Sequence, residues 1–179
     1  MGPVPRPAPT LSIDTAQVAQ LLVLIVAANA GPVLAWRVLG ARLGTPLDRG
    51  RVLGDGHRLL GADKTLRGVV AGIGAGAVAG ALLGLGAGLG ALFGLWAMVG
   101  DLCASFLKRR LGLAAGTSAL GLDQVPESLL PLLVLREALA ADGVTIAAAV
   151  LAFLVFERSV SPLLRRLGIR RRPGPGGAA

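Results

Sequence analysis

The run GDLCASFLKRRLG, residues 100–112, places charged and polar groups at helical spacing. Asp101 is four residues before Ser105, and Lys108 and Arg109 follow at the next turn, so that all four share one face of a helix. A carboxylate beside a hydroxyl and two cations is a set of groups that can handle a phosphate and its metal ion. The alternative is a stabilising contact between Asp101 and the basic end of its own helix.

A second set of such residues lies in the run GTPLDRGRVLGDGHRLLGADKTLRG, residues 44–68. Lys64 and Thr65 present an ammonium and a hydroxyl beside Gly61 and Gly68, whose backbone can approach a phosphate closely. These four residues fall on one face if the following helix starts early. The spacing is not that of a Walker A loop. A solvated, mixed-charge linker is the alternative interpretation of this run.

Three further polar residues lie inside or next to apolar segments. Asp123 and Gln124 stand just before a helix, where Asp123 could also serve as the N-cap. Asn29 lies within an apolar run, and a buried amide in a membrane needs a hydrogen-bond partner. We therefore expect Asn29 to be either a contact between helices or a donor into a polar cavity.

The elements that must position these residues are membrane helices. Of the 179 residues, 54% are hydrophobic and 16% are charged, which is too apolar for a soluble domain of this length. Apolar segments cover about 16–39, 66–107, 127–140 and 144–164, and the second is long enough for two spans joined by a turn near 85–88. The sequence thus predicts an all-α polytopic membrane protein of about five transmembrane helices. Whether the short segment 127–140 crosses fully is left open.

The positive charges predict the orientation of these helices. Lys and Arg cluster in 37–67, 108–110 and 158–172, whereas the turn near 86 and the link at 142–143 have none. By the positive-inside rule, 1–15 is an extracytoplasmic tail, 16–164 is one transmembrane catalytic domain with two basic cytoplasmic loops, and 165–179 is a basic, disordered cytoplasmic tail. A cleavable signal peptide is disfavoured because the tail has one Arg and Asp14 directly precedes the apolar run.

The net charge of +8 follows the membrane topology, so we expect anionic lipid headgroups and nucleotide phosphates as partners rather than nucleic acid. Asp101 would lie roughly 10 Å of helix before Lys108, inside the cytoplasmic half of the membrane. A carboxylate there costs on the order of 3 kcal/mol. We therefore expect Asp101 to face a polar cavity, with Ser105, Lys108 or Arg109 as its partner.

Glycines recur every four residues through the second predicted span. They form a bare stripe along one side of that helix, so another helix can approach it closely. The stripe comprises Gly68, Gly72, Gly76, Gly80, Gly84 and Gly88, and the third span repeats the spacing at Gly86, Gly90 and Gly94. Whether the stripe packs within the chain or in a homodimer is left open.

The order of these motifs resembles the CDP-archaeol synthase family, relatives of the phosphatidate cytidylyltransferases. The resemblance covers about 28–124 and rests on ANAGP, TPLDRGRVLGDGHRLLGADKTLRG, GDLCASFLKRRLG and LDQ. It implies a polytopic enzyme that uses CTP and Mg²⁺ to convert a lipid phosphate into a CDP-lipid, releasing pyrophosphate. Two positions depart from the family pattern: Ala62 separates Gly61 from the Asp-Lys-Thr run, and Leu66 replaces a common aromatic residue.

The resemblance also implies roles for the residues above. Asp101 and Asp123 would bind Mg²⁺, while Lys64, Arg67, Ser105, Lys108 and Arg109 would contact phosphates, and Asp48, Thr65 and Gln124 would line the nucleotide site. As a donor into a polar cavity, Asn29 would join the nucleotide site. The lipid phosphate is already largely dianionic at neutral pH, so no enzymic base is needed. The site would face the cytoplasm in the cell membrane.

Two other functions remain as alternatives. A small transporter or channel would use Asn29 and Asp101 as its polar pathway, but it leaves the concentration of polar groups on one side unexplained. A noncatalytic membrane adaptor leaves Asp101 unexplained. The lipid tail, isoprenoid ether or acyl ester, is not predicted by the residues.

Overall fold

The computed structural model describes residues 14–114 and 121–166, with side chains described as far as residue 160. Over these residues the chain forms five helices: α1 (Thr15–Leu39), α2 (Leu66–Leu82), α3 (Ala87–Arg110), α4 (Gln124–Val134) and α5 (Gly143–Arg166). The prediction of an all-α membrane protein is confirmed. The predicted tails at 1–15 and 165–179 lie almost wholly outside the described residues.

Three of the helices are long and apolar enough to cross a membrane: α1, α3 and α5. α2 is apolar but has 17 residues. The fourth predicted segment differs most from the prediction, because α4 begins at Gln124 and ends at Val134, and residues 135–140 form turns. With 11 residues, α4 is about 16 Å long, roughly half the thickness of a hydrocarbon core.

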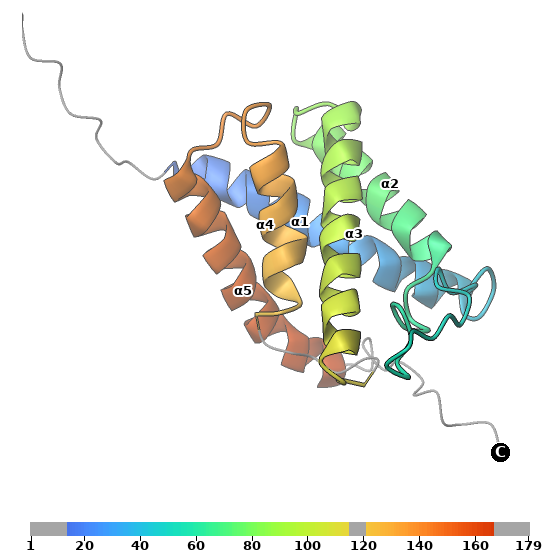
Figure 1. Ribbon diagram of the computed structural model, residues 1–179. Coiled ribbons are helices and arrows are strands. Elements are labelled where there is room, and N and C mark those ends of the chain that lie inside the picture. Colours follow the sequence, from blue (N-terminus) through green and yellow to red (C-terminus); the bar gives the residue numbers. More distant parts are fainter. Residues whose placement is uncertain (1–13, 115–120, 167–179) are drawn as a thin grey trace, which may run out of the picture.

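The helices form a bundle in which α1 runs across one side of the other four (Figure 1). α4 lies between α3 and α5, and α2 and α3 form a hairpin whose turn spans 83–86, close to the predicted position. Buried apolar side chains join α1, α3, α4 and α5 in one core. They include Leu24, Phe93, Leu132 and Phe153.

The glycine stripe packs within the chain. A Cβ added to Gly76 of α2 would lie 2.5 Å from the carbonyl oxygen of Gly90 in α3. On the other side of α2, a Cβ added to Gly31 of α1 would lie 2.5 Å from the carbonyl oxygen of Ala71. α2 is therefore held by backbone contacts on two sides, which only glycine permits. The stripe ends before Gly84 and Gly88, which are exposed.

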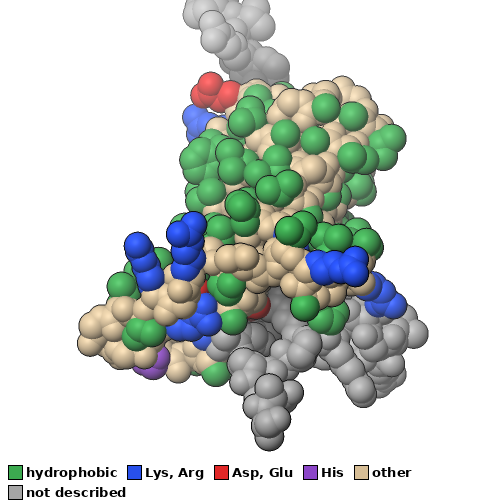
Figure 2. Space-filling model, turned by 90° about the vertical axis from the view of Figure 1, so that its right-hand side faces the viewer, with side chains coloured by type: hydrophobic (Ala, Val, Ile, Leu, Met, Phe, Trp, Pro, Cys, Tyr) green, Lys and Arg blue, Asp and Glu red, His purple; other side chains and the backbone are tan. Residues whose placement is uncertain are grey.

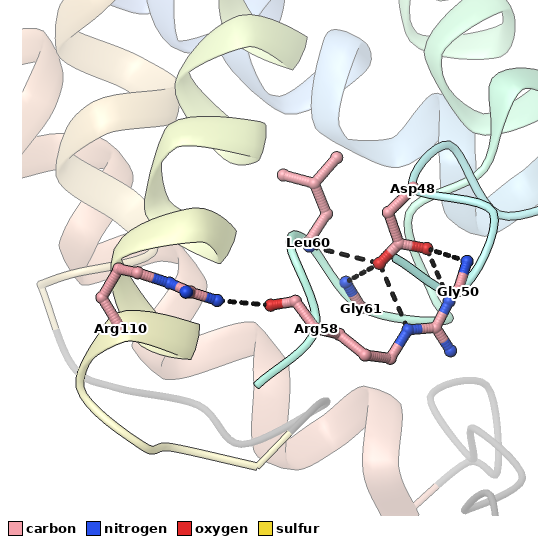
Figure 3. A network of polar contacts seen from close by, with 6 residues as sticks. All are labelled: Asp48, Gly50, Arg58, Leu60, Gly61 and Arg110. Atoms are coloured by element: carbon pink, nitrogen blue, oxygen red, sulfur yellow. Dashed lines mark hydrogen bonds and ion pairs between the residues drawn. The ribbon is translucent and has the colours of Figure 1, made fainter. Parts of the chain in front are cut away.

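The segment between α1 and α2 folds around the carboxylate of Asp48, which is buried (Figure 3). Arg58 donates to Asp48 Oδ1 at 2.5 Å, and the backbone N–H groups of Gly50, Leu60 and Gly61 donate at 3.0, 3.2 and 3.0 Å. Burial opposes ionisation of this carboxyl, but the hydrogen bonds outweigh it and hold the pKa of Asp48 well below its usual range.

Arg110 attaches this loop to the end of α3. Its guanidinium donates to the carbonyl oxygen of Arg58 at 2.7 Å and to Asp55 at 2.6 Å. Figure 2 shows hydrophobic side chains over most of the upper part of one face, and Lys and Arg side chains toward its lower part. α1 begins at the opposite end of the bundle from this loop (Figure 1). The start of α1 and this basic loop therefore lie at the two ends of the bundle.

Adding one methyl group to the glycine stripe is expected to destabilise the protein. In Gly76→Ala the new Cβ would meet backbone of α3, which cannot move aside alone, and overpacking of this kind typically costs about 1–3 kcal/mol. Gly74→Ala is the matched control, because a Cβ there meets open space. Thermal unfolding in detergent should show a lower Tm for Gly76→Ala than for Gly74→Ala. Equal Tm values would contradict the close contact.

The Asp48 network predicts a loss of stability in acid. Because its pKa is lower in the folded than in the unfolded chain, ionised Asp48 stabilises the fold above the ordinary Asp pKa of about 3.9, and this contribution fades as the pH falls below that value. Thermal unfolding of the wild type and of Asp48→Asn should be compared between about pH 6 and about pH 3. The variant should start less stable and lose less. Parallel curves would remove Asp48 as the source.

Candidate functional site

Lys64 and Asp101 form the first ion pair of the candidate site. Lys64 lies in the loop just before Thr65, the N-cap of α2, and Asp101 lies inside α3. The ammonium of Lys64 donates to both carboxylate oxygens of Asp101, at 2.7 and 2.6 Å, and the side chains are 12% and 23% exposed. Asp101 thus has a cationic partner, as expected for a carboxylate within a membrane helix. That partner comes from another element, and not from the following turns of α3.

Lys108 and Asp123 form the second ion pair. Lys108 lies two turns after Asp101 on the same face of α3, and Asp123 directly precedes α4. The ammonium of Lys108 is 2.5 Å from Asp123 Oδ1, and the side chains are 9% and 20% exposed. α3 therefore contributes the acid to one pair and the cation to the other.

Lys64 and Lys108 are the only lysines in the sequence, although the chain has 18 Lys and Arg residues in total. The other members of this total are all arginines. An ammonium is a compact, strongly hydrated charge on a flexible stem, whereas a guanidinium is a planar fork. The chain thus uses the ammonium only where a cation meets a carboxylate of this site.

Sequence reasoning missed one acid near the site, Glu127. Glu127 is 9% exposed, one turn after Asp123 in α4. The charges of Asp101, Glu157, Lys64 and Asp123 all act on it. The four-residue spacing between Asp123 and Glu127 could have indicated that both acids share a helix face.

Ser105 and Arg109 are buried on α3, as the predicted shared face requires. Ser105 lies between Asp101 and Lys108 in the sequence, and its side chain is withdrawn from solvent. Arg109 donates from Nη2 to the carbonyl oxygen of Ala114 at 2.8 Å, so it organises the segment that follows α3.

The other predicted site residues make local contacts that build the scaffold. Thr65 caps α2 by accepting from the N–H of Gly68 at 3.3 Å; α2 does not start early, so the predicted shared face of 61–68 does not form. The remaining contacts are Arg67 to the carbonyl oxygen of Arg42, Asn29 to the carbonyl oxygen of Ile25 in its own helix, Asp48 to its loop, and the N–H of Gly121 to Gln124 Oε1.

The arrangement suits a polyanion, because a phosphate oxygen could replace a carboxylate as the partner of the Lys64 or Lys108 ammonium. Among the described residues, no group of three or more His, Cys, Asp or Glu side chains could by itself hold a metal ion. Mg²⁺ does not need such a cage, because it is commonly bound by one or two carboxylates together with substrate phosphates and water. Asp101 and Asp123 fit this donor chemistry. Each now contacts a lysine, which is itself a phosphate-binding group.

The chain matches the model of the CarS-like family, described as CDP-archaeol synthase, over residues 18–87 and 85–171. It is 42% identical over 111 residues to the CDP-archaeol synthase of Aeropyrum pernix, covering 59% of this chain and 60% of that protein. It is 50% identical over 88 residues to that of Methanopyrus kandleri, covering 46% of this chain and 51% of that protein. The matched region thus spans about half to three fifths of these relatives.

A solved structure of an intramembrane enzyme for archaeal membrane lipid biosynthesis is similar over most of both chains. The TM-score is 0.69 at 36% sequence identity, and the match covers 84% of this chain and 95% of that one. The chain belongs to the CarS-like family of CDP-archaeol synthases.

Proposed function

We propose that this protein is a membrane cytidylyltransferase that transfers CMP from CTP to a lipid phosphate, giving a CDP-lipid and pyrophosphate. The observation that carries the proposal is the pair of Lys–Asp contacts on one face of α3, in a chain of the CDP-archaeol synthase family. Both contacts join groups that suit a triphosphate and its cation.

The reaction needs charge placement more than side-chain acid–base chemistry. An oxygen of the lipid phosphate attacks the α-phosphorus of CTP, and the bond to the β-phosphate oxygen breaks, so that pyrophosphate leaves with the bond electrons. Lys64 and Lys108 would stabilise the charge that develops on the departing phosphates. Their flexible stems allow each ammonium to leave its carboxylate partner for a phosphate oxygen.

Mg²⁺ is part of the proposal, with Asp101 and Asp123 as the residues that would hold it. When bound, it would neutralise phosphate charge and help to align the two substrates. Ser105 would donate to a phosphate oxygen, while Arg109 and Arg67 would add positive charge. Thr65, Asp48, Asn29 and Gln124 would shape the nucleotide site through the scaffold contacts that they already make.

The site would face the cytoplasm of a multi-pass protein in the cell membrane. The basic loop and the end of α3 lie together at one end of the bundle, where the positive-inside rule places such charges (Figures 1 and 2). CTP would reach this end from water, and the lipid phosphate would enter from the bilayer. The short α4 borders the site. On that side, the site is flanked by a helix about half as long as a membrane span.

The transporter alternative is less well supported. A pathway would need its polar groups spread across the membrane. Asn29 instead bonds the carbonyl oxygen of Ile25 in its own helix, and the paired charges gather near one end of α3.

The proposed activity is tested by pyrophosphate release from CTP by purified protein in detergent, with phosphatidate and an isoprenoid glycerol phosphate offered separately. We expect release that requires one of these lipids and Mg²⁺. Asp101→Asn should reduce it on the order of 100-fold or more while the Tm stays near that of the wild type. Asp142→Asn, in the loop before α5, is the matched control and should stay active. Silence of folded wild type with both lipids would refute the proposal.

Replacing the lysine of the first pair by arginine should also abolish most of the activity, although the charge is kept. Lys64→Arg would hold Asp101 with a planar, bidentate fork, which cannot release one oxygen as an ammonium can. We expect a fall in kcat on the order of 10- to 100-fold at an unchanged Tm. The control is Arg51→Lys in the exposed loop. Wild-type kcat in Lys64→Arg would show that charge alone suffices.

A further inference from the structure

Part of the loop between α1 and α2, residues 42–53, exposes apolar side chains. Leu43 is 74% exposed and Val52 57% exposed, and Leu53 is exposed as well. Lipid tails explain the apolar surface of the long helices, but these three residues lie beyond Leu39, the last residue of α1. Single exposed apolar residues are common on proteins, so the meaning of this group depends on the backbone and the charges around it.

Two residues of this loop hold a backbone conformation that most side chains disfavour. The φ angle is +54° at Leu43 and +46° at Arg49, in the left-handed region that suits glycine or asparagine. The fold imposes this turn at Arg49, because the N–H of Gly50 donates to the carboxylate of Asp48 at 3.0 Å. Residues held in such conformations concentrate at functional positions. A leucine with this backbone and an exposed side chain points to a partner outside the chain.

The same loop carries positive charge that the chain itself does not neutralise. Three of its exposed arginines form no ion pair with a described residue: Arg42, Arg49 and Arg51. The two acids of residues 37–62, Asp48 and Asp55, are bound by Arg58 and Arg110. The loop thus combines exposed apolar side chains with unpaired guanidinium groups, which is the chemistry of segments that lie on anionic membrane surfaces.

The position of the loop relative to the apolar helices suits a membrane surface. The loop lies at the lower right of Figure 1, and Figure 2 looks at this side of the molecule. A lobe at the lower left of Figure 2 projects beyond the hydrophobic upper part, and Lys and Arg side chains rise from it toward that part. Near the end of α1, the exposed Trp36 directly precedes Arg37. Tryptophan is enriched at the level of lipid headgroups, so the loop begins close to that level.

We propose that residues 42–53 are a docking loop that binds anionic lipid headgroups of the surrounding membrane. Its apolar side chains enter the interfacial layer, and its three unpaired arginines bind phosphate groups there. The loop is also bonded to the candidate site, because the N–H of Leu47 donates to the carbonyl oxygen of Lys64 at 2.8 Å. Docking therefore steadies the backbone that presents Lys64 to Asp101.

The first test measures the depth of the loop and needs no turnover. A nitroxide label on Val52→Cys, with the single native cysteine removed as Cys103→Ser, is placed in nanodiscs of phosphatidylcholine with or without phosphatidylglycerol, an anionic phosphodiester. In the anionic discs we expect more collisions of the label with oxygen and fewer with a water-soluble nickel complex. A label on Glu137→Cys, exposed in the turns after α4, is the control and should behave alike in both discs.

Charge should control this depth. Replacing Arg42, Arg49 and Arg51 together by glutamine should return the Val52 label to water in the anionic discs. Raising the salt from about 0.1 M to about 1 M should do the same without any variant, because the screening length falls from about 10 to about 3 Å.

Three results would overturn the docking loop. One is equal exposure of the label in neutral and anionic discs, and another is a depth that ignores both the glutamines and the salt. The third is a label shielded only in discs that hold two copies of the protein, which would assign the surface to a second copy of this chain.

The second test concerns the link to the site and rests on the proposed function. Pyrophosphate release from CTP is measured in the same discs at a fixed fraction of the lipid phosphate substrate. We expect kcat to be higher in the anionic discs, on the order of 5-fold. The triple glutamine variant should keep the neutral-disc rate and lose this increase, whereas Arg136→Gln, exposed after α4, should retain it.

The two proposals fail in different ways. If the wild type releases no pyrophosphate in any disc, the proposed function falls, and the depth of the label still decides whether the loop docks. If the wild type is equally active in neutral and anionic discs, the proposed function stands, and the link between docking and Lys64 is overturned.

Discussion

The contact of α2 with α3 through glycine backbone is the constraint on which the rest of the structure depends. Side chains on either helix at Gly76 or Gly90 would force the two apart. Lys64 directly precedes Thr65, the N-cap of α2, and Asp101 lies on α3. The separation of these two helices therefore determines whether the two side chains meet. The backbone contact between α2 and α3 thus sets the geometry of the first ion pair, although the glycines that permit it have no side chains.

The sequence predicted the helical elements well because hydrophobic length is a strong signal. The boundaries of α1, α3 and α5 agree with the predicted spans to within a few residues, and the shared face of Asp101 and Lys108 follows from helical periodicity. α4 was less predictable. Pro131 lies inside it, and the polar residues Arg136 and Glu137 lie in the turns that follow Val134, so its apolar pattern is too short to set its end.

The pairing of the charges could not be predicted, because it depends on contacts between elements. Periodicity along α3 relates Asp101 only to residues of that helix, whereas its actual partner, Lys64, is 37 residues earlier. The role of Asp48 was hidden for a similar reason, since backbone N–H groups carry no sequence signal. Glu127 was missed because nothing in the sequence marks Gly100 as the point where α4 touches α3.

The restriction of lysine to the two ion pairs has a consequence for the covalent reactivity of this protein. Reagents that acylate or alkylate primary amines must reach the nitrogen atom, and in both ion pairs that atom contacts a carboxylate on a side chain that is mostly withdrawn from solvent. Apart from the N-terminal amine, the primary amines open to such a reagent are those of residues 64 and 108, and each becomes accessible when its ion pair opens. The numerous arginines give it no other target. Amine acylation of the intact protein would thus measure, residue by residue, how often each pair is open.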